Sequence, residues 1–132
     1  MKISASIKSK FNQHDILVQT DDSTKEIQIS PKSSGYGSSV NGGELLLLSL
    51  ATCFCNDIYR EAGKRNLEIS GVNVIFKGEF GAEGEPGSNF TYKVKVTSKA
   101  AASEIEELIK CTDKLAEIHN TLRKGIEIKL TS

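Results

Sequence analysis

The sequence predicts an α+β fold with its elements in the order βββαββαβ. Two observations support this: several short segments alternate between apolar and polar side chains, and two longer segments place apolar residues at helical spacing. A chain of 132 residues is also long enough for one domain with a substantial core. We therefore expect a single domain over residues 1–132, with antiparallel sheets packed on a long central helix.

Three strands come first. The segment 2–11 predicts a half-buried strand, because its apolar side chains share one face: Ile3, Ala5, Ile7 and Phe11. A turn at residues 12–15 and a polar cluster at 20–25 lead to two further strands, at 16–19 and 26–30. Residues 30–43 are rich in glycine and serine and predict the only long loop, which is a common place for function.

The central helix begins at Asn41 and Glu44, whose spacing is that of a capping box, and extends to about Arg65. Its leucines at 45–48 and 50 cover nearly the whole circumference of the first turns, so the helix must be covered on every side. Exposing a leucine costs roughly 1.5 to 3 kcal/mol. A chain this small has little left to cover the third side, which favours a homodimer over a monomer.

The second half of the chain predicts a hairpin, a helix and a last strand. Strands at 67–80 and 90–98 flank the loop 81–89, with Val72, Val74, Phe76 and Phe80 sharing a face of the first strand. Ser103 and Glu106 form a second capping box, and the helix they open ends at Gly125. The segment IEIKL, residues 126–130, alternates and predicts the final strand.

Composition excludes several classes of partner. The chain has 17 basic and 17 acidic residues without a basic stripe, so nucleic acid and anionic membranes are not expected partners. The N-terminal segment has no apolar core, and the longest apolar run is about half of the ~20 residues that span a bilayer. Three cysteines fit a reducing compartment better than a disulfide framework, so we expect a cytoplasmic protein.

Two cysteines lie in the central helix. Cys53 shares a face with Ser49, Asp57 and Arg60, where Arg60 would favour a thiolate and Asp57 would oppose it or pair with the arginine. Cys55 shares a face with apolar residues, so we expect its side chain to pack in the hydrophobic core. Residues i and i+2 point about 160° apart, so the two cannot form a good disulfide. A metal ion is not expected, since the other cysteine and the histidines lack ligand spacing. Whether Cys53 is reactive or only packs stays open.

Two segments resemble the OsmC/Ohr family of osmotically induced and organic-hydroperoxide-resistance proteins. They are GGELLLLSLATCFCNDIYREAGKRNLEISGVNVIFKGEF, residues 42–80, and AEIHNTLRKGIEIKL, residues 116–130. The resemblance implies an α+β intertwined homodimer with two long helices between sheets and a small pocket at the dimer interface. This agrees with the homodimer that burial of the leucine helix predicts.

The resemblance also implies a chemistry. In the family's peroxidases a cysteine at the position of Cys53 attacks the peroxide bond, and a second cysteine on the second helix resolves the sulfenic acid. Here Ala116 and Glu117 stand where the family has its Cys-Pro, so the second cysteine is absent. The family's glutamate position is Gly43, and no arginine precedes Arg60. His119, one turn beyond Ala116, could serve as the base or ion-pair partner of Cys53, or could simply pack.

Three functions follow as alternatives. The first is a thiol-dependent hydroperoxide reductase that acts through Cys53, helped by Arg60 and His119, with an external thiol reductant and no cofactor. It predicts a lowered pKa for Cys53. The second is a non-catalytic dimer that binds a small apolar ligand in the interface pocket. Its ligand would meet Tyr36 in the loop, which acts as a lid, and Glu44 and Ser49 on the helix. The third gives the leucine helix a purely structural role.

Overall fold

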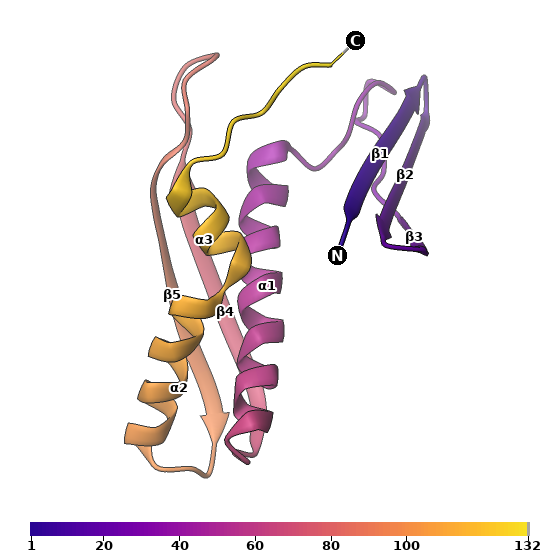
Figure 1. Cartoon of the computed structure of the whole chain (residues 1–132). Coiled ribbons are helices and arrows are strands. Elements are labelled where there is room, and N and C mark those ends of the chain that lie inside the picture. Colours follow the sequence, from indigo (N-terminus) through magenta and orange to yellow (C-terminus); the bar gives the residue numbers. More distant parts are fainter. Residues whose placement is uncertain (132) are drawn as a thin grey trace. The chain divides into compact units, whose positions relative to one another are not determined.

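The computed structural model describes residues 1–131 and forms two compact units, Met1–Leu45 and Leu46–Ser132. The mixture of antiparallel strands and helices confirms the α+β class. Figure 1 shows the elements, which are β1 (Ile3–Lys10), β2 (Gln13–Thr20), β3 (Ser23–Ile27), α1 (Gly42–Lys64), β4 (Ile69–Glu79), β5 (Ser88–Ser98), α2 (Ala102–Leu115) and α3 (Glu117–Lys124). The single domain expected over residues 1–132 stays a prediction.

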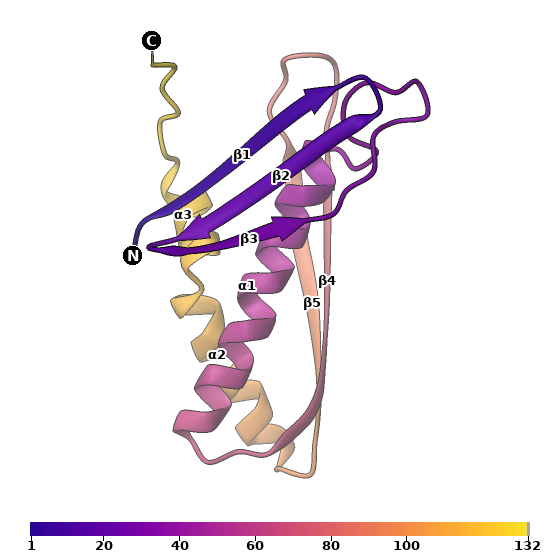
Figure 2. The ribbon, with the colours of Figure 1, turned by 90° about the vertical axis from the view of Figure 1, so that its right-hand side faces the viewer.

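The first unit is an antiparallel sheet with strand order β1-β2-β3 (Figure 2). Its hairpins are tighter than expected. Asn12 and Asp21 adopt positive φ angles of 56° and 49°, which these two residue types tolerate better than most. Each turn therefore needs only two residues, and the polar residues on either side of it join the strands.

The burial expected for β1 is wrong. All eight of its residues are exposed, including Ile3 at 65% and Ile7 at 57% of their surface. The alternation of the segment correctly predicts a strand, but a single three-stranded sheet cannot bury its own apolar face without a second layer. The alternating pattern predicts which face of the strand is apolar, but it does not predict which other element packs on that face.

The second unit packs α1 and α2 on the β4–β5 hairpin. Phe54, Ile58 and Ala62 lie four residues apart on α1, so they share one stripe of the helix, and they form the core with Leu108 and Ala116. The inward faces of β4 and β5 contact this core as expected, through Val72, Val74, Tyr92, Val94 and Val96. Phe80 is exposed, because β4 has already ended at Glu79.

The second helix starts differently from the prediction. Helix α2 begins at Ala102, and Ala101 occupies the N-cap without a side-chain hydrogen bond. The capping box expected from Ser103 and Glu106 is therefore wrong, because both residues already lie inside the helix. Glu106 pairs instead with Lys110 at 3.0 Å, one turn further on.

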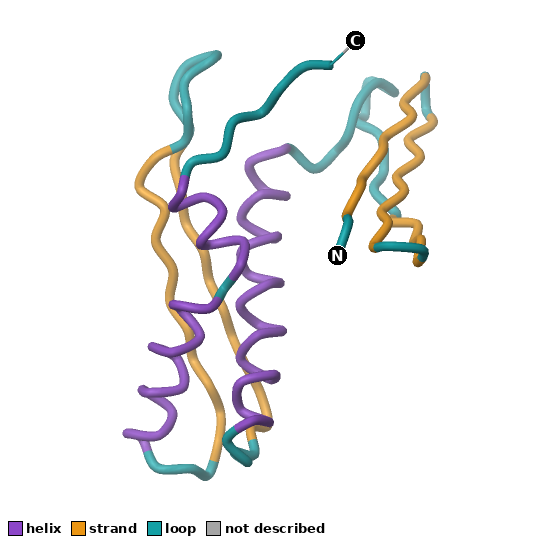
Figure 3. The backbone as a smooth tube through the Cα atoms, viewed as in Figure 1, coloured by secondary structure: helices purple, strands orange, loops and turns teal. Residues whose placement is uncertain are grey.

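The same segment is two helices and not one. Ala116 adopts φ −63° and ψ 110°, which ends α2 and begins α3, and Figure 3 shows the short non-helical piece between them. Alanine gives no signal for a break, since it is the best helix former. Arg123 of α3 holds the bend by donating to Asp113 of α2, to its carboxylate at 2.8 Å and to its carbonyl at 2.9 Å.

The last strand is absent. Residues 126–131 have no regular structure, and the alternating side chains of Ile126, Ile128 and Leu130 are exposed. A strand needs a neighbour to pair its backbone groups, and nothing else in residues 1–131 pairs with this segment. Over the same residues, no helix is both long and apolar enough to cross a membrane.

Candidate active site around Cys53

Helix α1 sets the position of Cys53. Its start is the capping box expected from the sequence, since the Glu44 amide donates to the Asn41 side chain at 2.8 Å and the Asn41 amide donates to the Glu44 carboxylate at 3.0 Å. Cys53 lies in the middle of the helix, beside the fully buried Phe54, and is itself partly buried. The thiol therefore stands at the edge of the core with one side open to solvent.

Two carboxylates contact this thiol. The sulfur of Cys53 donates to Asp57 Oδ2 at 3.6 Å and to Glu117 Oε2 at 3.8 Å. Asp57 lies one turn further along α1 and is buried, whereas Glu117 is the first residue of α3 and its side chain is 66% exposed. The bend at Ala116 thus brings the beginning of α3 to the middle of α1.

Arg60 completes the cluster without touching the sulfur. Its guanidinium pairs with Asp57 at 3.1 Å, with Glu61 at 3.1 Å and with Glu117 at 3.5 Å. Among residues 1–131 it makes no hydrogen bond to Cys53. Both outcomes left open for Asp57 occur, since it pairs with Arg60 and also opposes a thiolate by raising the pKa of Cys53. Arg60 is thus linked to the thiol through the two carboxylates that both of them contact.

The electrostatics of the cluster oppose a thiolate. Burial raises the pKa of Cys53, and the nearby Asp57 and Glu117 raise it further, while the backbone N–H of Ile118 lowers it. The lowered pKa expected for Cys53 is therefore wrong in direction. Burial also raises the pKa of Asp57, against the attraction of Arg60. The pKa of Glu117 is lowered, chiefly by its own backbone N–H and with a contribution from Arg60.

His119 lies in an aromatic cluster. It is 5% exposed, and its ring centroid lies 5.1 to 5.6 Å from those of Phe54, Phe76 and Tyr92. Neither ring nitrogen has a hydrogen-bond partner, so the structure does not join His119 to Cys53. Burial, with the charge of Arg123, lowers the pKa of His119 and favours the neutral ring, and Asp113 opposes this.

The other cysteines lie in different surroundings. Cys55 lines a hollow of about 360 Å³ between α1 and β4, with Ala51, Val72 and Val74 among its neighbours. Cys111 donates to Glu107 at 3.3 Å on α2. All three cysteines of the chain are free thiols, and all three lie within the described residues. The expectation that Cys53 and Cys55 do not form a disulfide is confirmed.

A metal ion would have one set of ligands here. Cys53, Asp57 and Glu117 are the only group of three acidic, cysteine or histidine side chains in residues 1–131 whose donor atoms lie within 4.8 Å of one another. The guanidinium of Arg60 already contacts both carboxylates, so a cation would have to compete with it. The arrangement is that of an ion-pair network beside a thiol.

The three expected ligand residues fall in different places. Tyr36 is 65% exposed, and its ring lies 5.2 Å from that of Phe11 in the first unit. Glu44 serves the start of α1, as described above. Ser49 is exposed on α1. A role for these three residues in binding a ligand stays a prediction.

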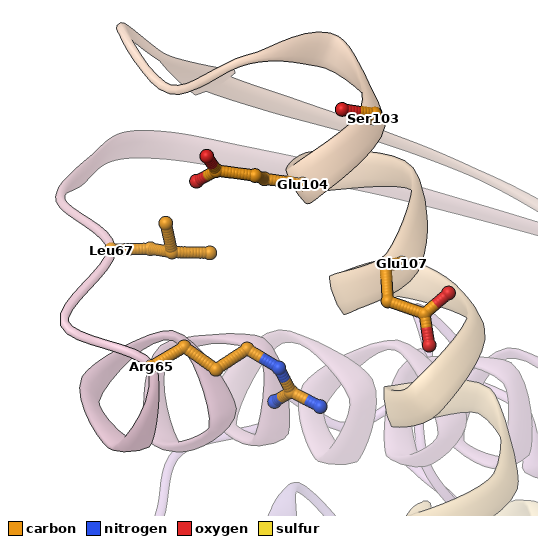
Figure 4. A pocket seen from close by; sticks show the side chains of 5 residues that line it. All are labelled: Arg65, Leu67, Ser103, Glu104 and Glu107. Atoms are coloured by element: carbon orange, nitrogen blue, oxygen red, sulfur yellow. The ribbon is translucent and has the colours of Figure 1, made fainter.

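A small hollow lies at the far end of the second unit from the Ala116 bend. Figure 4 shows its lining, with Arg65 and Leu67 just after α1 and Ser103, Glu104 and Glu107 on α2. Its volume is about 320 Å³. The guanidinium of Arg65 pairs with Glu61 at 3.5 Å, and the hollow contains two further carboxylates. None of the residues that contact Cys53 lines it.

Sequence reasoning missed one residue of the site and misjudged another. Asp57 could be found, because a residue four positions after Cys53 lies beside it on a helix. Its burial could not be found from the sequence. Glu117 was identified only as standing where the family has its Cys-Pro, and its contact with Cys53 was missed, since that contact depends on the break at Ala116, for which the sequence carries no signal.

The OsmC-like protein family matches residues 35–131. The chain belongs to this family. An OsmC-like protein from Mycoplasma pneumoniae has a similar structure, with a TM-score of 0.61 and 21% identity over 92% of this chain and 86% of that chain. An organic hydroperoxide resistance protein OsmC from Legionella pneumophila gives a TM-score of 0.58 and 18% identity, over 98% and 94% of the two chains.

A third structure of this OsmC-like fold is a Vibrio cholerae OsmC-like protein of unknown function, with a TM-score of 0.59 and 16% identity over 92% of this chain and 93% of that chain. A comparison with curated protein sequences finds no match. At these identities the solved structures show that the OsmC-like fold is shared, and they do not by themselves assign an activity.

Proposed function

We propose that this OsmC-like protein reduces organic hydroperoxides through Cys53. The observation that supports this most is the placement of a partly buried free thiol in the middle of α1, touched by two carboxylates and backed by a guanidinium. Reaction of a thiol with a peroxide requires access, a way to lose the proton and polar groups around the reacting oxygens. The hydroperoxide resistance protein from Legionella pneumophila, which shares the fold, supports the choice of substrate.

The reductant in this proposal is an external thiol. Glu117 contacts Cys53 on the helix where the related peroxidases are expected to carry their second cysteine. Cys111 is engaged with Glu107, and Cys55 lines a separate hollow. The oxidised Cys53 would therefore be reduced by two thiol groups of another molecule. Three free cysteines also fit a reducing cytoplasm as the place of action.

Consumption of cumene hydroperoxide by the purified protein with a dithiol reductant tests the proposal. The wild type and Cys111→Ser are expected to turn over at the same rate, while Cys53→Ser loses turnover. Cys55→Ser is the matched control on the same helix and is expected to retain it. Turnover that survives Cys53→Ser, or a wild type no faster than the dithiol alone, would contradict the proposal.

We further propose that the protein works as a homodimer. The apolar face of β1 and the alternating tail from Ile126 to Leu130 are exposed in the single chain, and Leu48 of α1 is 60% exposed. The sequence predicts that one face of β1 is apolar, that the leucines of α1 are covered and that the tail forms a strand, so a second copy of the chain is the cover that fits these surfaces.

A second candidate function is the binding of a small apolar ligand without turnover. A hollow of about 700 Å³ in the second unit favours it, with Tyr59, Ala62, Leu67 and Ile69 in its lining. This volume is in the range of small-molecule sites. Binding of an apolar fluorescent probe such as ANS would be unchanged in Cys53→Ser if this function holds, and would be weakened by Tyr59→Asp, which changes an exposed side chain of the lining and leaves the core intact.

A further inference from the structure

The thiol of Cys53 must lose its proton before or during attack on a peroxide, because the thiolate is the nucleophile. Its surroundings favour the protonated form, since burial and two carboxylates act together. A base in contact with the sulfur can remove this proton during the attack, so the resting protein does not need a free thiolate. The question is which group that base is.

Three charged side chains face the sulfur or its partners. Asp57 and Arg60 come from α1, and Glu117 comes from α3. Arg60 is a permanent cation and cannot accept a proton. The ring nitrogens of His119 have no hydrogen-bond partner, so the base expected from the sequence makes no contact with the thiol. The choice therefore lies between Asp57 and Glu117.

Geometry and burial favour Asp57. Its Oδ2 lies 3.6 Å from the sulfur while its Oδ1 lies 3.1 Å from Arg60, so the carboxylate is fixed between the thiol and the guanidinium. Asp57 is 6% exposed, and burial raises the pKa of its carboxyl, which strengthens it as a base. Glu117 is solvent-exposed, and its lowered pKa makes it the weaker base of the two.

We infer that Asp57 carries the proton of the reaction, which deepens the hydroperoxide reduction proposed above and rests on it. The Asp57 carboxylate takes the proton from the Cys53 thiol as the sulfur attacks the distal oxygen of the hydroperoxide. The O–O bond breaks, the distal oxygen stays on the sulfur with its hydrogen as a sulfenic acid, and two electrons pass from the sulfur to the peroxide. Asp57 returns the proton to the leaving alkoxide, which departs as the alcohol.

Arg60 and Glu117 have positioning roles in this reaction. The ion pair between Arg60 and Asp57 holds the carboxylate in contact with the sulfur, and Glu117 accepts a second hydrogen bond from the thiol. Arg60 also bridges the two carboxylates, which would otherwise repel each other across the sulfur. The carboxylate of Asp57 is the one catalytic group of the three, because it exchanges a proton with the reacting atoms.

Two rates measured on each protein test the inference. The first is oxidation of Cys53 by excess cumene hydroperoxide without reductant, followed as a dimedone-trapped sulfenic acid by mass spectrometry. The second is alkylation of Cys53 by iodoacetamide, which reports the thiolate. The proteins are the wild type, Asp57→Asn, Asp57→Glu and Glu106→Gln, the last changing an exposed glutamate of α2 as the control.

Asp57→Asn is expected to slow oxidation about 100-fold at pH 7, the usual scale for a lost general base. It is expected to speed alkylation, because removing the negative charge makes the thiolate easier to form. A merely structural effect would move both rates the same way. Asp57→Glu is expected to recover part of the oxidation rate, and it also shows whether loss in Asp57→Asn comes from misfolding. Glu106→Gln is expected to match the wild type in both rates.

Two results would overturn the inference, and only the first of them would also overturn the proposed hydroperoxide reduction. If the wild type is oxidised no faster than a free cysteine peptide, the proposed hydroperoxide reduction fails and the role of Asp57 fails with it. If the wild type is oxidised rapidly and Asp57→Asn is equally rapid, only the role of Asp57 fails, and the reaction then proceeds from a thiolate without a carboxylate base.

Discussion

The sulfur of Cys53 contacts two carboxylates directly, and the nearby guanidinium contacts those carboxylates. Asp57 and Glu117 contact it, and Arg60 contacts both of them. Burial is the largest cause of the raised pKa of this thiol, and the two carboxylates in contact with it raise the pKa further. The resting protein is therefore expected to carry a protonated Cys53 at neutral pH.

Removal of the charge on Glu117 tests this arrangement. Glu117→Gln keeps the size of the side chain and removes a negative charge 3.8 Å from the sulfur, so the pKa of Cys53 is expected to fall. Alkylation by iodoacetamide at pH 7 should become about two- to fivefold faster, a modest change because solvent screens this exposed charge. An unchanged rate would show that burial and Asp57 keep the thiol protonated without a contribution from Glu117.

His119 makes the stability of the protein depend on pH. Its pKa in the folded protein is lower than its usual value of about 6.5, so the unfolded chain binds the proton more readily. The stabilisation is complete above about pH 6.5 and is lost as the pH falls below it, with a slope of at most about 1.4 kcal/mol per pH unit. Urea unfolding at pH 7.5 and at pH 5 measures the loss.

The matched variant for that experiment is His119→Phe, which keeps an aromatic ring against Phe54, Phe76 and Tyr92 and removes the titrating group. Its free energy of unfolding should fall less between pH 7.5 and pH 5 than that of the wild type. An equal fall in both proteins would assign the acid sensitivity to other groups, such as the carboxylates around Arg60.

At the scale of the elements, α1 combines a polar start with a buried stripe. The capping box of Asn41 and Glu44 satisfies backbone N–H groups that would otherwise lack partners at the helix start. Further along, Phe54, Ile58 and Ala62 bury the helix against the hairpin and α2. The cap fixes where the helix begins, and the stripe fixes which side faces the core.

Asn41→Ala is expected to destabilise the protein by about 1 kcal/mol, the usual cost of losing an N-cap side chain. Chemical denaturation followed by circular dichroism measures the change. Asn41→Asp should cost much less, because a carboxylate oxygen can accept the same hydrogen bond from Glu44. Equal losses in the two variants would show that the side-chain hydrogen bond does not stabilise the helix start.

Helix α2 is held by a narrow stripe. Leu108 is fully buried, whereas Leu115 on the same helix is 46% exposed. Leu108→Ala should cost about 2 to 5 kcal/mol, because it removes buried surface and leaves a cavity. Leu115→Ala serves as the control and should cost much less. Similar losses for the two leucines would contradict the packing described here.

The elements also show what a sequence can predict. Alternation correctly predicts β1, β4 and β5, and the spacing of Asn41 and Glu44 correctly predicts the start of α1. These signals are local, since the residues that decide them are neighbours along the chain. Helical spacing also predicts that Asp57 and Arg60 lie beside Cys53. The break at Ala116 depends on packing between segments far apart in sequence, and the contact of Glu117 with Cys53 depends on that break, so these two features could not be predicted.

At the scale of the whole molecule, the main feature of the single chain is the apolar surface that it leaves exposed to solvent. Ile3 and Ile7 of β1 and the tail after Gly125 carry side chains that alternate as in a buried strand. In the proposed homodimer these surfaces are covered. The alternation that predicts a final strand therefore supports the proposal that this segment forms its strand by pairing with a second copy of the chain.

Sedimentation equilibrium is expected to give twice the 14.3 kDa mass of one chain. Ile7→Lys, which places a charge on the exposed apolar face of β1, should weaken the dimer and lower the average mass at micromolar concentration. Lys8→Glu, on the opposite face of the same strand, is the control and should leave the mass unchanged. A wild type with the mass of one chain would contradict the homodimer.

The bend between α2 and α3 has a consequence for evolution and for design. Ala116 is fully buried and cannot be enlarged without disturbing the core, but Glu117 next to it is mostly exposed while still touching Cys53. Exposed positions usually accept substitution within about 0.5 kcal/mol of stability. Residue 117 is thus a place where the charge and chemistry facing the thiol can be exchanged, with the scaffold around it left intact.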